Sequence, residues 1–308
     1  MSLIALRKQV LCFKGFCNIG VIVNDRREAL LIDAGLDGRV ARQIKSMLDE
    51  NQLKLKGIIL THAHADHYGG ASYLSESSGA RIYCGSEEKS VIDNPILESV
   101  CLFGGAYPPA ELRRKFFNAP KVTVDGTVSP GETEVEGFPL EVVDLSGHTL
   151  GQIGVAVEKV LFCADSLATP AQIKKQGILK NTGIEQSLQT LERLKDRKEL
   201  LFVPSHGEIF RDIQSLAADS QALIRQTLSL VLQMTEEPIG IEDLLAQMCE
   251  KKSIVIKSLS QYYVTHLSIL AYVGCLLDRA QISVIYSGNK QLFLRRVPAA
   301  EEHLFCDS

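Results

Sequence analysis

The segment Gly57–Gly70, GIILTHAHADHYGG, places metal-binding side chains directly after an apolar run. Three histidines and one aspartate lie within six residues here, although the whole chain contains only seven histidines. The run GIIL is typical of a buried strand, and the polar residues follow where that strand ends. The glycine pair that closes the segment lets the chain pack tightly as it enters the next helix. The segment therefore predicts a strand-end loop, where the backbone can aim several side chains at one point.

The residue types in this loop favour a metal site. Neutral imidazole and carboxylate are ligands suited to zinc and similar first-row ions. His62 and His64 are two residues apart and can share one face of the loop, while Asp66 and His67 turn toward an adjoining centre. An ordinary polar surface loop is the weaker interpretation.

Three more ligand-type residues lie at the ends of predicted strands. His148 follows the run LEVVDL, Asp165 ends the run VLFCAD, and His206 follows the run LLFVP. A single histidine in such a place is usually structural. Five of the seven histidines lie in strand-end loops, together with two aspartates, so we expect these loops to converge on one edge of a sheet.

Composition and length indicate a globular enzyme. The 308 residues suit one large domain, or one catalytic domain with a small appendage, and hydrophobic residues make up 45% of the chain. The formal net charge of -4 provides no general attraction to nucleic acid. The start resembles no signal peptide, there is no long apolar run, and the eight cysteines are scattered without a CxxC pair. We expect a cytoplasmic protein with reduced cysteines and no membrane span.

The order of predicted elements indicates an α+β fold in two parts. Up to residue 210, short strands mixed with helices suggest two packed sheets covered by helices, with a lid-like insertion at residues 86–139. Residues 211–308 show helical patterns followed by two β runs around a tight-turn signal at residues 287–290. Three helices and a hairpin form the order of a winged helix, so we predict a small, mostly helical C-terminal domain.

The motif HAHADH, followed by SGHT, FCADS and PSHG, resembles the metallo-β-lactamase fold superfamily, and specifically its glyoxalase II-like hydrolases with the HxHxDH signature. The resemblance covers about residues 9–210 and implies a four-layer αββα sandwich with a dinuclear centre. It assigns ligands to two metals: His62, His64 and His148 to the first, Asp66, His67 and His206 to the second, and Asp165 to both. Asp33, which ends the run ALLID, matches an aspartate that orients a ligand histidine. A turn cap before Gly35 is the alternative role for Asp33.

The resemblance implies hydrolysis with two Zn²⁺ per chain, and with iron or manganese as alternative metals. Zinc can lower the pKa of bound water from about 15.7 to roughly 7, which supplies hydroxide at neutral pH. Asp66 would ligate a metal, orient the nucleophile and pass a proton to the leaving group. The expected substrate is a small molecule with an ester-type bond, either a thioester or a lactone.

Two tyrosines are candidate substrate contacts. Tyr68, next to His67, could form a hydrogen bond with the substrate or could pack beneath the loop. Tyr107 lies in the insertion, between the pairs Gly104-Gly105 and Pro108-Pro109, which could act as bends of a lid. The aromatic residues of the insertion could instead form a small core of their own.

Other functions share parts of this pattern. Persulfide dioxygenases with one iron also carry HxHxDH, and some relatives act on phosphodiesters or nucleic acids. RNA-processing relatives carry an inserted domain or a flexible substrate arm, and neither is evident here.

A non-enzyme alternative is a DNA-binding regulator that uses its winged helix. Residues 215–308 contain eight basic and ten acidic side chains, a balance that suits a phosphate backbone poorly. The helical pattern at residues 265–280 is apolar almost all round. It suits packing on the catalytic domain or formation of a homodimer.

Overall fold

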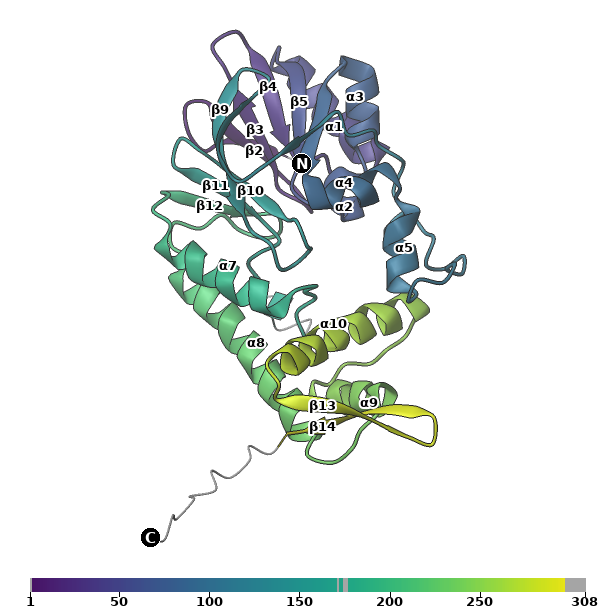
Figure 1. Cartoon of the computed structure of the whole chain (residues 1–308). Coiled ribbons are helices and arrows are strands. Elements are labelled where there is room, and N and C mark those ends of the chain that lie inside the picture. The colour runs from purple at the N-terminus through teal and green to yellow at the C-terminus, as the bar shows by residue number, and fades with distance from the viewer. Residues whose placement is uncertain (1, 171, 174–176, 297–308) are drawn as a thin grey trace, which may run out of the picture.

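Two packed β-sheets form the centre of the computed structural model, which describes residues 2–170, 172–173 and 177–296 (Figure 1). The first sheet has the order β1 (Ser2–Ala5), β2 (Val10–Lys14), β3 (Ile19–Val23), β4 (Glu28–Ile32), β5 (Lys54–Leu60), β6 (Arg81–Gly85) and β7 (Gly126–Val128). Its strands are antiparallel from β1 to β4 and parallel from β4 to β7.

The second sheet has the order β12 (Leu201–Pro204), β11 (Val160–Ala164), β10 (Ile153–Val157), β9 (Phe138–Asp144) and β8 (Gly131–Val135). β11 and β12 are parallel, and the other pairs are antiparallel. β9, β11 and β12 therefore run in the same direction, so their carboxyl ends meet at one edge.

The central strands of each sheet are buried on both faces, which explains the continuous apolar runs in the sequence. In β11, Val160 and Phe162 point to the core between the two sheets, whereas Leu161 and Cys163 point to the core beneath the outer helices. The first sheet is covered by α1 (Gly38–Glu50) and α3 (Ala71–Ser78), and the second sheet by α7 (Ile184–Asp196) and α8 (Gln214–Met234). The predicted αββα sandwich is confirmed.

The outer helices follow from local sequence signals. The side chain of Asp37 caps α1 by accepting hydrogen bonds from the backbone N–H groups of Arg39 and Val40. Ala41, Ile44 and Leu48 recur at helical spacing and form the buried face of α1.

The segment predicted as an insertion is only partly irregular. It contains α4 (Ser86–Asp93) and α5 (Ile96–Leu102), and its last part contributes β7 and β8 to the two sheets. Phe103 and Phe117 belong to a small cluster with Tyr263 of α10 (Leu259–Asp278). The rings of Phe103 and Tyr263 lie 5.0 Å apart. Phe103 and Phe117 thus form a small core with α10, one of the alternatives expected for the aromatic residues of this segment, whereas Tyr107 and Phe116 are exposed and lie outside it.

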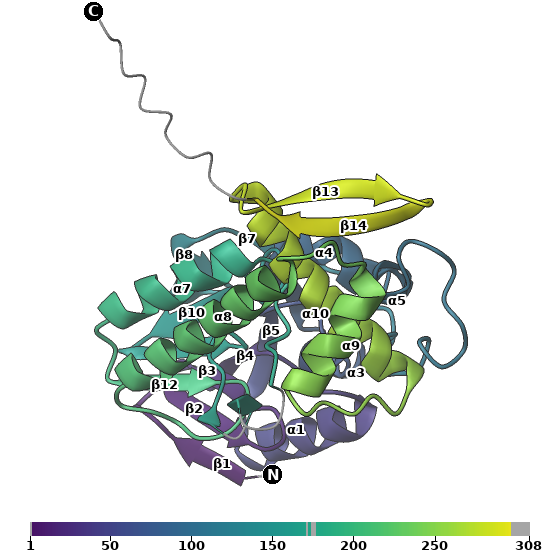
Figure 2. The same cartoon turned by 90° about the horizontal axis from the view of Figure 1, so that it is seen from below.

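The C-terminal elements share one core with the outer face of the second sheet. They are α8, α9 (Ile241–Lys251), α10 and the hairpin of β13 (Ile282–Ser287) and β14 (Lys290–Arg295). Residues from all of them belong to the same apolar cluster as α7. Figure 2, which is seen from below, shows α8, α9 and α10 side by side in front of the two sheets. The helical character of this region is as expected; a domain division at residue 210 and a winged helix stay predictions. In the described residues, no helix is long and apolar enough to cross a membrane.

Gly69 and Gly70 bring the short helix α2 (Ala65–Tyr68) against the loop that follows β4. A Cβ at Gly69 would lie 2.0 Å from the carbonyl oxygen of Leu36, and one at Gly70 would lie 2.3 Å from that of Ala34. The N–H of Gly70 donates to the Gly35 carbonyl at 2.9 Å. The glycine pair thus fixes how closely these two loops approach.

We predict that Gly69→Ala lowers the free energy of unfolding by roughly 1–3 kcal/mol, because the added methyl group overlaps backbone atoms that cannot move aside. Gly274→Ala is the control, since Gly274 lies inside α10 with no heavy atom within 4 Å of an added Cβ. It should stabilise the protein by about 0.5–1 kcal/mol. Denaturant titration measures both values, and an unchanged midpoint for Gly69→Ala would contradict the packing argument.

Candidate metal centre

The seven side chains predicted as metal ligands come together at one end of the sandwich. His62 and His64 lie in the loop after β5, and Asp66 and His67 lie on α2. The remaining three follow strands of the second sheet, in this order: His148 after β9, Asp165 after β11 and His206 after β12. Because β9, β11 and β12 run in one direction, their following loops meet at the edge of the sheet beside β5.

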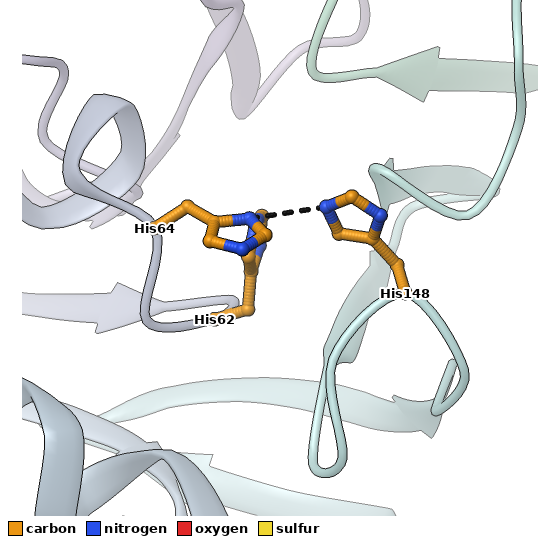
Figure 3. Close-up of side chains that lie close together, drawn as sticks. All are labelled: His62, His64 and His148. Atoms are coloured by element: carbon orange, nitrogen blue, oxygen red, sulfur yellow. Dashed lines mark hydrogen bonds between the residues drawn. The ribbon is translucent and has the colours of Figure 1, made fainter. Parts of the chain in front are cut away.

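Three histidines form the first group. Nε2 of His62 lies 2.9 Å from Nδ1 of His64, and Nε2 of His148 lies 3.0 Å from the same atom. Figure 3 shows the rings of two separate loops pointing toward one another. Nitrogen ligands of one tetrahedral zinc ion lie about 3.3 Å apart, given a Zn–N distance of about 2.05 Å. The three nitrogen atoms are therefore close to the spacing that a shared ion requires.

Burial keeps this first group neutral. It lowers the pKa of His62 and of His64 well below the ordinary value, and lowers the pKa of His148 to about 4. Neutral imidazole is the form that binds metals. At neutral pH, protons therefore compete little with a cation for these three nitrogen atoms.

The second group combines Asp66, His67 and His206. Nε2 of His206 lies 3.3 Å from Oδ2 of Asp66, and Nε2 of His67 lies 3.8 Å from Oδ1 of the same carboxylate. Nε2 of His67 is buried and has no hydrogen-bond partner among the described residues. An unpaired buried nitrogen that faces carboxylates fits a position beside a cation.

Asp165 lies between the two groups. Its Oδ2 is 3.7 Å from Nε2 of His148, 3.7 Å from Nε2 of His67 and 3.5 Å from Nε2 of His206. One oxygen atom thus faces a nitrogen of the first group and two nitrogens of the second. This is the placement expected for a carboxylate that bridges two ions.

The charges of the second group indicate that it needs a cation. Burial opposes ionisation of His206, but hydrogen bonds to Asp165 and Asp66 raise its pKa to about 11. Burial also opposes ionisation of His67, but Cys17 and the carboxylates of Asp33, Asp165 and Asp66 raise its pKa well above the ordinary value. In the absence of a metal, two imidazolium ions therefore balance the carboxylates. A divalent ion would replace these protons, so the donor set fits metal binding.

The outward-facing nitrogens of the ligand candidates are held by fixed partners. Nδ1 of His148 donates to the carbonyl of Lys180, and Nδ1 of His206 donates to that of Phe16, both at 2.8 Å. Oδ2 of Asp33 lies 2.8 Å from Nδ1 of His67. Such partners fix the orientation of a ligand imidazole and the tautomer that it adopts.

Asp33 is itself anchored. Its carboxylate accepts the N–H of Thr61 at 2.8 Å and the hydroxyl of Thr61 at 3.0 Å. Its φ of 67° lies in the left-handed region, which Asp and Asn tolerate better than most residues. The side chain of Asp33 thus faces His67, a ligand candidate. A residue that only capped the turn would not need this contact.

Three polar side chains at the site escaped sequence reasoning. Glu88, buried in α4, accepts the N–H of Ala63 at 2.8 Å through Oε2. Its Oε1 accepts the hydroxyl of Thr149 at 2.7 Å and the N–H of Gly151 at 2.8 Å. Glu88 thus ties the His62 loop to the His148 loop. Lys180 places Nζ 2.9 Å from Nε2 of His64. Glu98 and Lys180 both line the pocket that opens beside the ligand candidates. Their sequence context carries no motif that would have identified them.

The two tyrosines do not reach the site. Tyr68 is fully buried, and burial raises the pKa of its hydroxyl. Tyr107 is 71% exposed, and the guanidinium of Arg113 lies over its ring. Neither residue borders the pocket of about 560 Å³ that His64, Asp66, His148, Asp165 and His206 help to line. A pocket of this volume lies within the usual range for small-molecule sites.

The sequence matches the model of the metallo-beta-lactamase superfamily over residues 13–206, and the chain belongs to that superfamily. Metallohydrolases of this superfamily bind metal ions, and the histidine-rich groups described above could hold them. The predicted superfamily is therefore confirmed.

Curated relatives include hydroxyacylglutathione hydrolases. The hydrolase GloC of Haemophilus influenzae is 32% identical over 152 residues, which cover 49% of this chain and 66% of the relative. The hydroxyacylglutathione hydrolase of Shewanella loihica is 28% identical over 176 residues, which cover 54% and 53%. The chain thus spans between about half and two thirds of the length of these relatives.

Solved structures share the fold over nearly the whole chain. A β-lactamase domain protein from Burkholderia ambifaria matches with a TM-score of 0.73 and 16% identity, over 96% of this chain and 93% of that one. A metallo-β-lactamase family protein from Thermus thermophilus matches with a TM-score of 0.69 and 21% identity, over 95% and 96%. Because both matches cover at least 95% of this chain, the shared fold includes its C-terminal helices.

We predict that Asp33→Asn weakens metal binding at the second group by about 10- to 100-fold, because His67 loses the carboxylate that orients it. Asn tolerates the same backbone conformation, so the fold should persist. Zinc titration of chelator-treated protein measures the affinity, with Asp25→Asn in an exposed turn as the control. Unchanged affinity would show that Asp33 only supports the turn.

Glu98 is a partly buried acid on α5 whose Oε2 is buried and has no hydrogen-bond partner among the described residues. Burial raises its pKa from 4.5 to about 7. The folded protein therefore keeps this proton at pH values where the unfolded chain has released it. Stability attributable to this group falls as pH rises from 4.5 to 7.

We predict that Glu98→Gln stabilises chelator-treated protein at pH 8 by up to roughly 3 kcal/mol, because the variant has no carboxyl group to ionise. The gain should vanish at pH 4. Denaturant titrations at several pH values measure it, with the exposed Glu76→Gln as the control. A gain that does not depend on pH would disprove this origin.

Proposed function

We propose that this chain is a dinuclear metal-dependent hydrolase that uses two Zn²⁺ to cleave a small-molecule thioester, with lactones as the next substrate class. The observation that carries the proposal is the position of Asp165, whose Oδ2 faces nitrogens of both histidine groups within 3.7 Å. The relatives named hydroxyacylglutathione hydrolases support the thioester, since hydroxyacylglutathione is one.

The proposed ligands divide as the two groups do. His62, His64 and His148 would hold the first ion, Asp66, His67 and His206 the second, and Asp165 both. Ions in such a site lower the pKa of water and polarise a carbonyl oxygen.

The residues of this chain then position the reactants. Asp66 is nine-tenths buried beside the pocket and hydrogen-bonded to His206, so it can orient the attacking water and accept its proton. Water adds to the acyl carbon, the carbon–sulfur bond breaks, and the proton held by Asp66 passes to the departing thiolate. The ammonium group of Lys180, beside His64, adds positive charge near the carbonyl oxygen.

The alternative with one iron ion would use only one group of ligands. It would leave His67 Nε2 without a hydrogen-bond partner and the carboxylates around it balanced only by protons on His67 and His206, so the geometry favours two ions. The nitrogen-rich first group supports zinc or iron over manganese, because imidazole suits zinc and iron whereas manganese prefers oxygen ligands.

The C-terminal elements have a packing role in this proposal. α10 contributes Ile269, Tyr272 and Leu276 to the core and contacts α5 at the rim of the site. On the hairpin, Arg295 forms an ion pair with Glu236. These contacts support packing of the C-terminal elements on the rest of the chain. A homodimer through these elements and a cytoplasmic location stay predictions.

We predict that His67→Ala lowers the zinc content from two ions to one per chain and lowers thioester turnover by roughly 10²-fold or more. Elemental analysis and a panel of thioesters, lactones and phosphodiesters measure both effects. His266→Ala, on α10 beside Tyr262, is the control and should change neither. One iron without zinc, with consumption of a persulfide, would instead identify the dioxygenase.

A further inference from the structure

The turn that follows α5 carries three consecutive cations beside the metal pocket. Arg113, Arg114 and Lys115 are all exposed. The next residue, Phe116, borders the pocket that the ligand candidates help to line. The turn belongs to the loop between α5 and β7, which lies at the margin of the molecule (Figure 1). These cations therefore stand at the mouth of the proposed active site.

The first turns of α1 bring two more arginines to this margin. Nζ of Lys115 lies 2.9 Å from Oδ2 of Asp37, the residue that caps α1. Arg39 and Arg42 follow Asp37 closely in the sequence, and both are exposed. We call the five cations, Arg39, Arg42, Arg113, Arg114 and Lys115, the basic rim. In the described part of the chain, Lys115 is the one member of the rim that forms an ion pair. The rim thus has a local excess of positive charge in a chain whose formal net charge is -4.

Buried neighbours hold the turn in place. Leu112 and Phe117, on either side of the exposed residues, are buried in the small core beside α10. Oγ of Ser99 on α5 lies 2.7 Å from the carbonyl oxygen of Leu112 and 2.9 Å from that of Phe117. The nearest acid in the sequence, Glu111, accepts the N–H of Leu259 at 3.1 Å and so faces α10. A turn that is already ordered loses little conformational entropy when it binds a ligand.

Two exposed aromatic rings accompany the basic rim. Tyr107 is 71% exposed and Phe116 is 48% exposed. The guanidinium of Arg113 lies 5.2 Å from the centre of the Tyr107 ring. Guanidinium groups bind phosphate through paired hydrogen bonds, and exposed aromatic rings stack on nucleobases. The rim therefore combines the two kinds of side chain that recognise a phosphorylated nucleotide.

The pocket between the basic rim and the ligand candidates has polar groups in its walls. Ser146 and Asn181 line it, and neither side chain forms a hydrogen bond with another described residue. Both can bond the amide groups of an extended arm that joins a thioester at the metals to a nucleotide at the rim. A glutathionyl carrier also has amide groups, so the basic rim, rather than the walls, distinguishes the two carriers.

We propose that the basic rim binds the phosphates of a thiol carrier that ends in a phosphorylated nucleotide, the chemical class to which coenzyme A belongs. This inference rests on the proposed thioester hydrolysis and concerns the carrier rather than the acyl group. A glutathionyl group has carboxylates and an ammonium group but no phosphate, so its charge complements the rim less well. The bond changes are those already described: water adds to the acyl carbon, the carbon–sulfur bond breaks, and the carrier leaves as the free thiol with its nucleotide intact.

The first experiment compares thioesters of one short acyl group with coenzyme A, with glutathione and with pantetheine, which lacks the nucleotide, on zinc-loaded protein. We expect kcat/KM for the coenzyme A thioester to exceed both others by roughly 10-fold or more, mainly through a lower KM. Added salt should reduce this advantage, because it screens exposed charges. Equal kcat/KM for the coenzyme A and pantetheine thioesters would overturn the assignment, as would a preference for glutathione.

Charge reversal locates the contact. Arg113→Glu combined with Arg114→Glu should lower kcat/KM for the coenzyme A thioester by roughly 10-fold or more and leave the pantetheine thioester unchanged. Lys8→Glu combined with Arg26→Glu is the matched control and should change neither, because these exposed cations precede β2 and β4. A loss of equal size with both thioesters would show that the arginines only maintain the structure.

The second experiment separates binding from catalysis. Calorimetry with adenosine 3′,5′-bisphosphate should show binding to zinc-loaded protein that weakens by roughly 10-fold or more in the double variant of Arg113 and Arg114. If this binding occurs but no thioester is cleaved, the assignment of the rim stands and the proposed activity fails. If thioesters are cleaved with no preference for the nucleotide carrier, the assignment fails and the activity stands. Single-stranded RNA that binds more tightly than the nucleotide, and loses affinity in the same variant, would overturn the assignment and identify a nucleic-acid surface.

Discussion

The concentration of buried carboxylates around two histidines at one end of the sandwich is the constraint on which the site depends. Asp33, Asp66 and Asp165 all lie within 4 Å of Nδ1 or Nε2 of His67. Isolated buried charges of one sign are costly, and each needs an opposite charge or several hydrogen bonds. Protons on His67 and His206 can supply this balance, and a pair of cations supplies it better because one ion contacts several ligands at once. The first histidine group, by contrast, is neutral and needs no such balance.

The scaffold holds this cluster by means of partners drawn from distant segments. Glu88 joins two ligand loops, Asp33 holds His67, and backbone carbonyls hold His148 and His206. The glycines after His67 let the loop that follows β4 press against α2. The site thus rests on rigid strand ends and on hydrogen bonds that fix each ring, rather than on the loops alone.

Much of the site could be predicted from sequence because its signals are local. The HAHADH run and the three strand-end residues identify the ligand candidates, and apolar runs identify strands that are buried on both faces. Asp33 ends such a strand, but its role as the partner of a ligand histidine came from the resemblance to the superfamily. The resemblance to the superfamily supplied the pairing of ligands, which spacing alone leaves open.

The remaining features could not be predicted because they depend on contacts across the fold. Glu88 and Lys180 reach the site from segments far from any ligand motif, and their neighbours in sequence resemble ordinary surface helix and loop. The short strands β7 and β8 have too few apolar residues to stand out from the irregular stretch before them. Adjacency to His67 suggested Tyr68 as a substrate contact, but α2 turns that side chain into the core.

The hydrogen bond between Phe16 and His206 has a consequence for biosynthesis. It joins positions 190 residues apart. The ring of His206 therefore cannot be oriented until most of the polypeptide has left the ribosome and the two sheets have packed together. Of the seven ligand candidates, a ribosome-bound fragment that ends before residue 140 has only the four in the HAHADH run. Assembly of the complete centre is therefore a late event in the maturation of this protein, because it requires that the two sheets have already packed together.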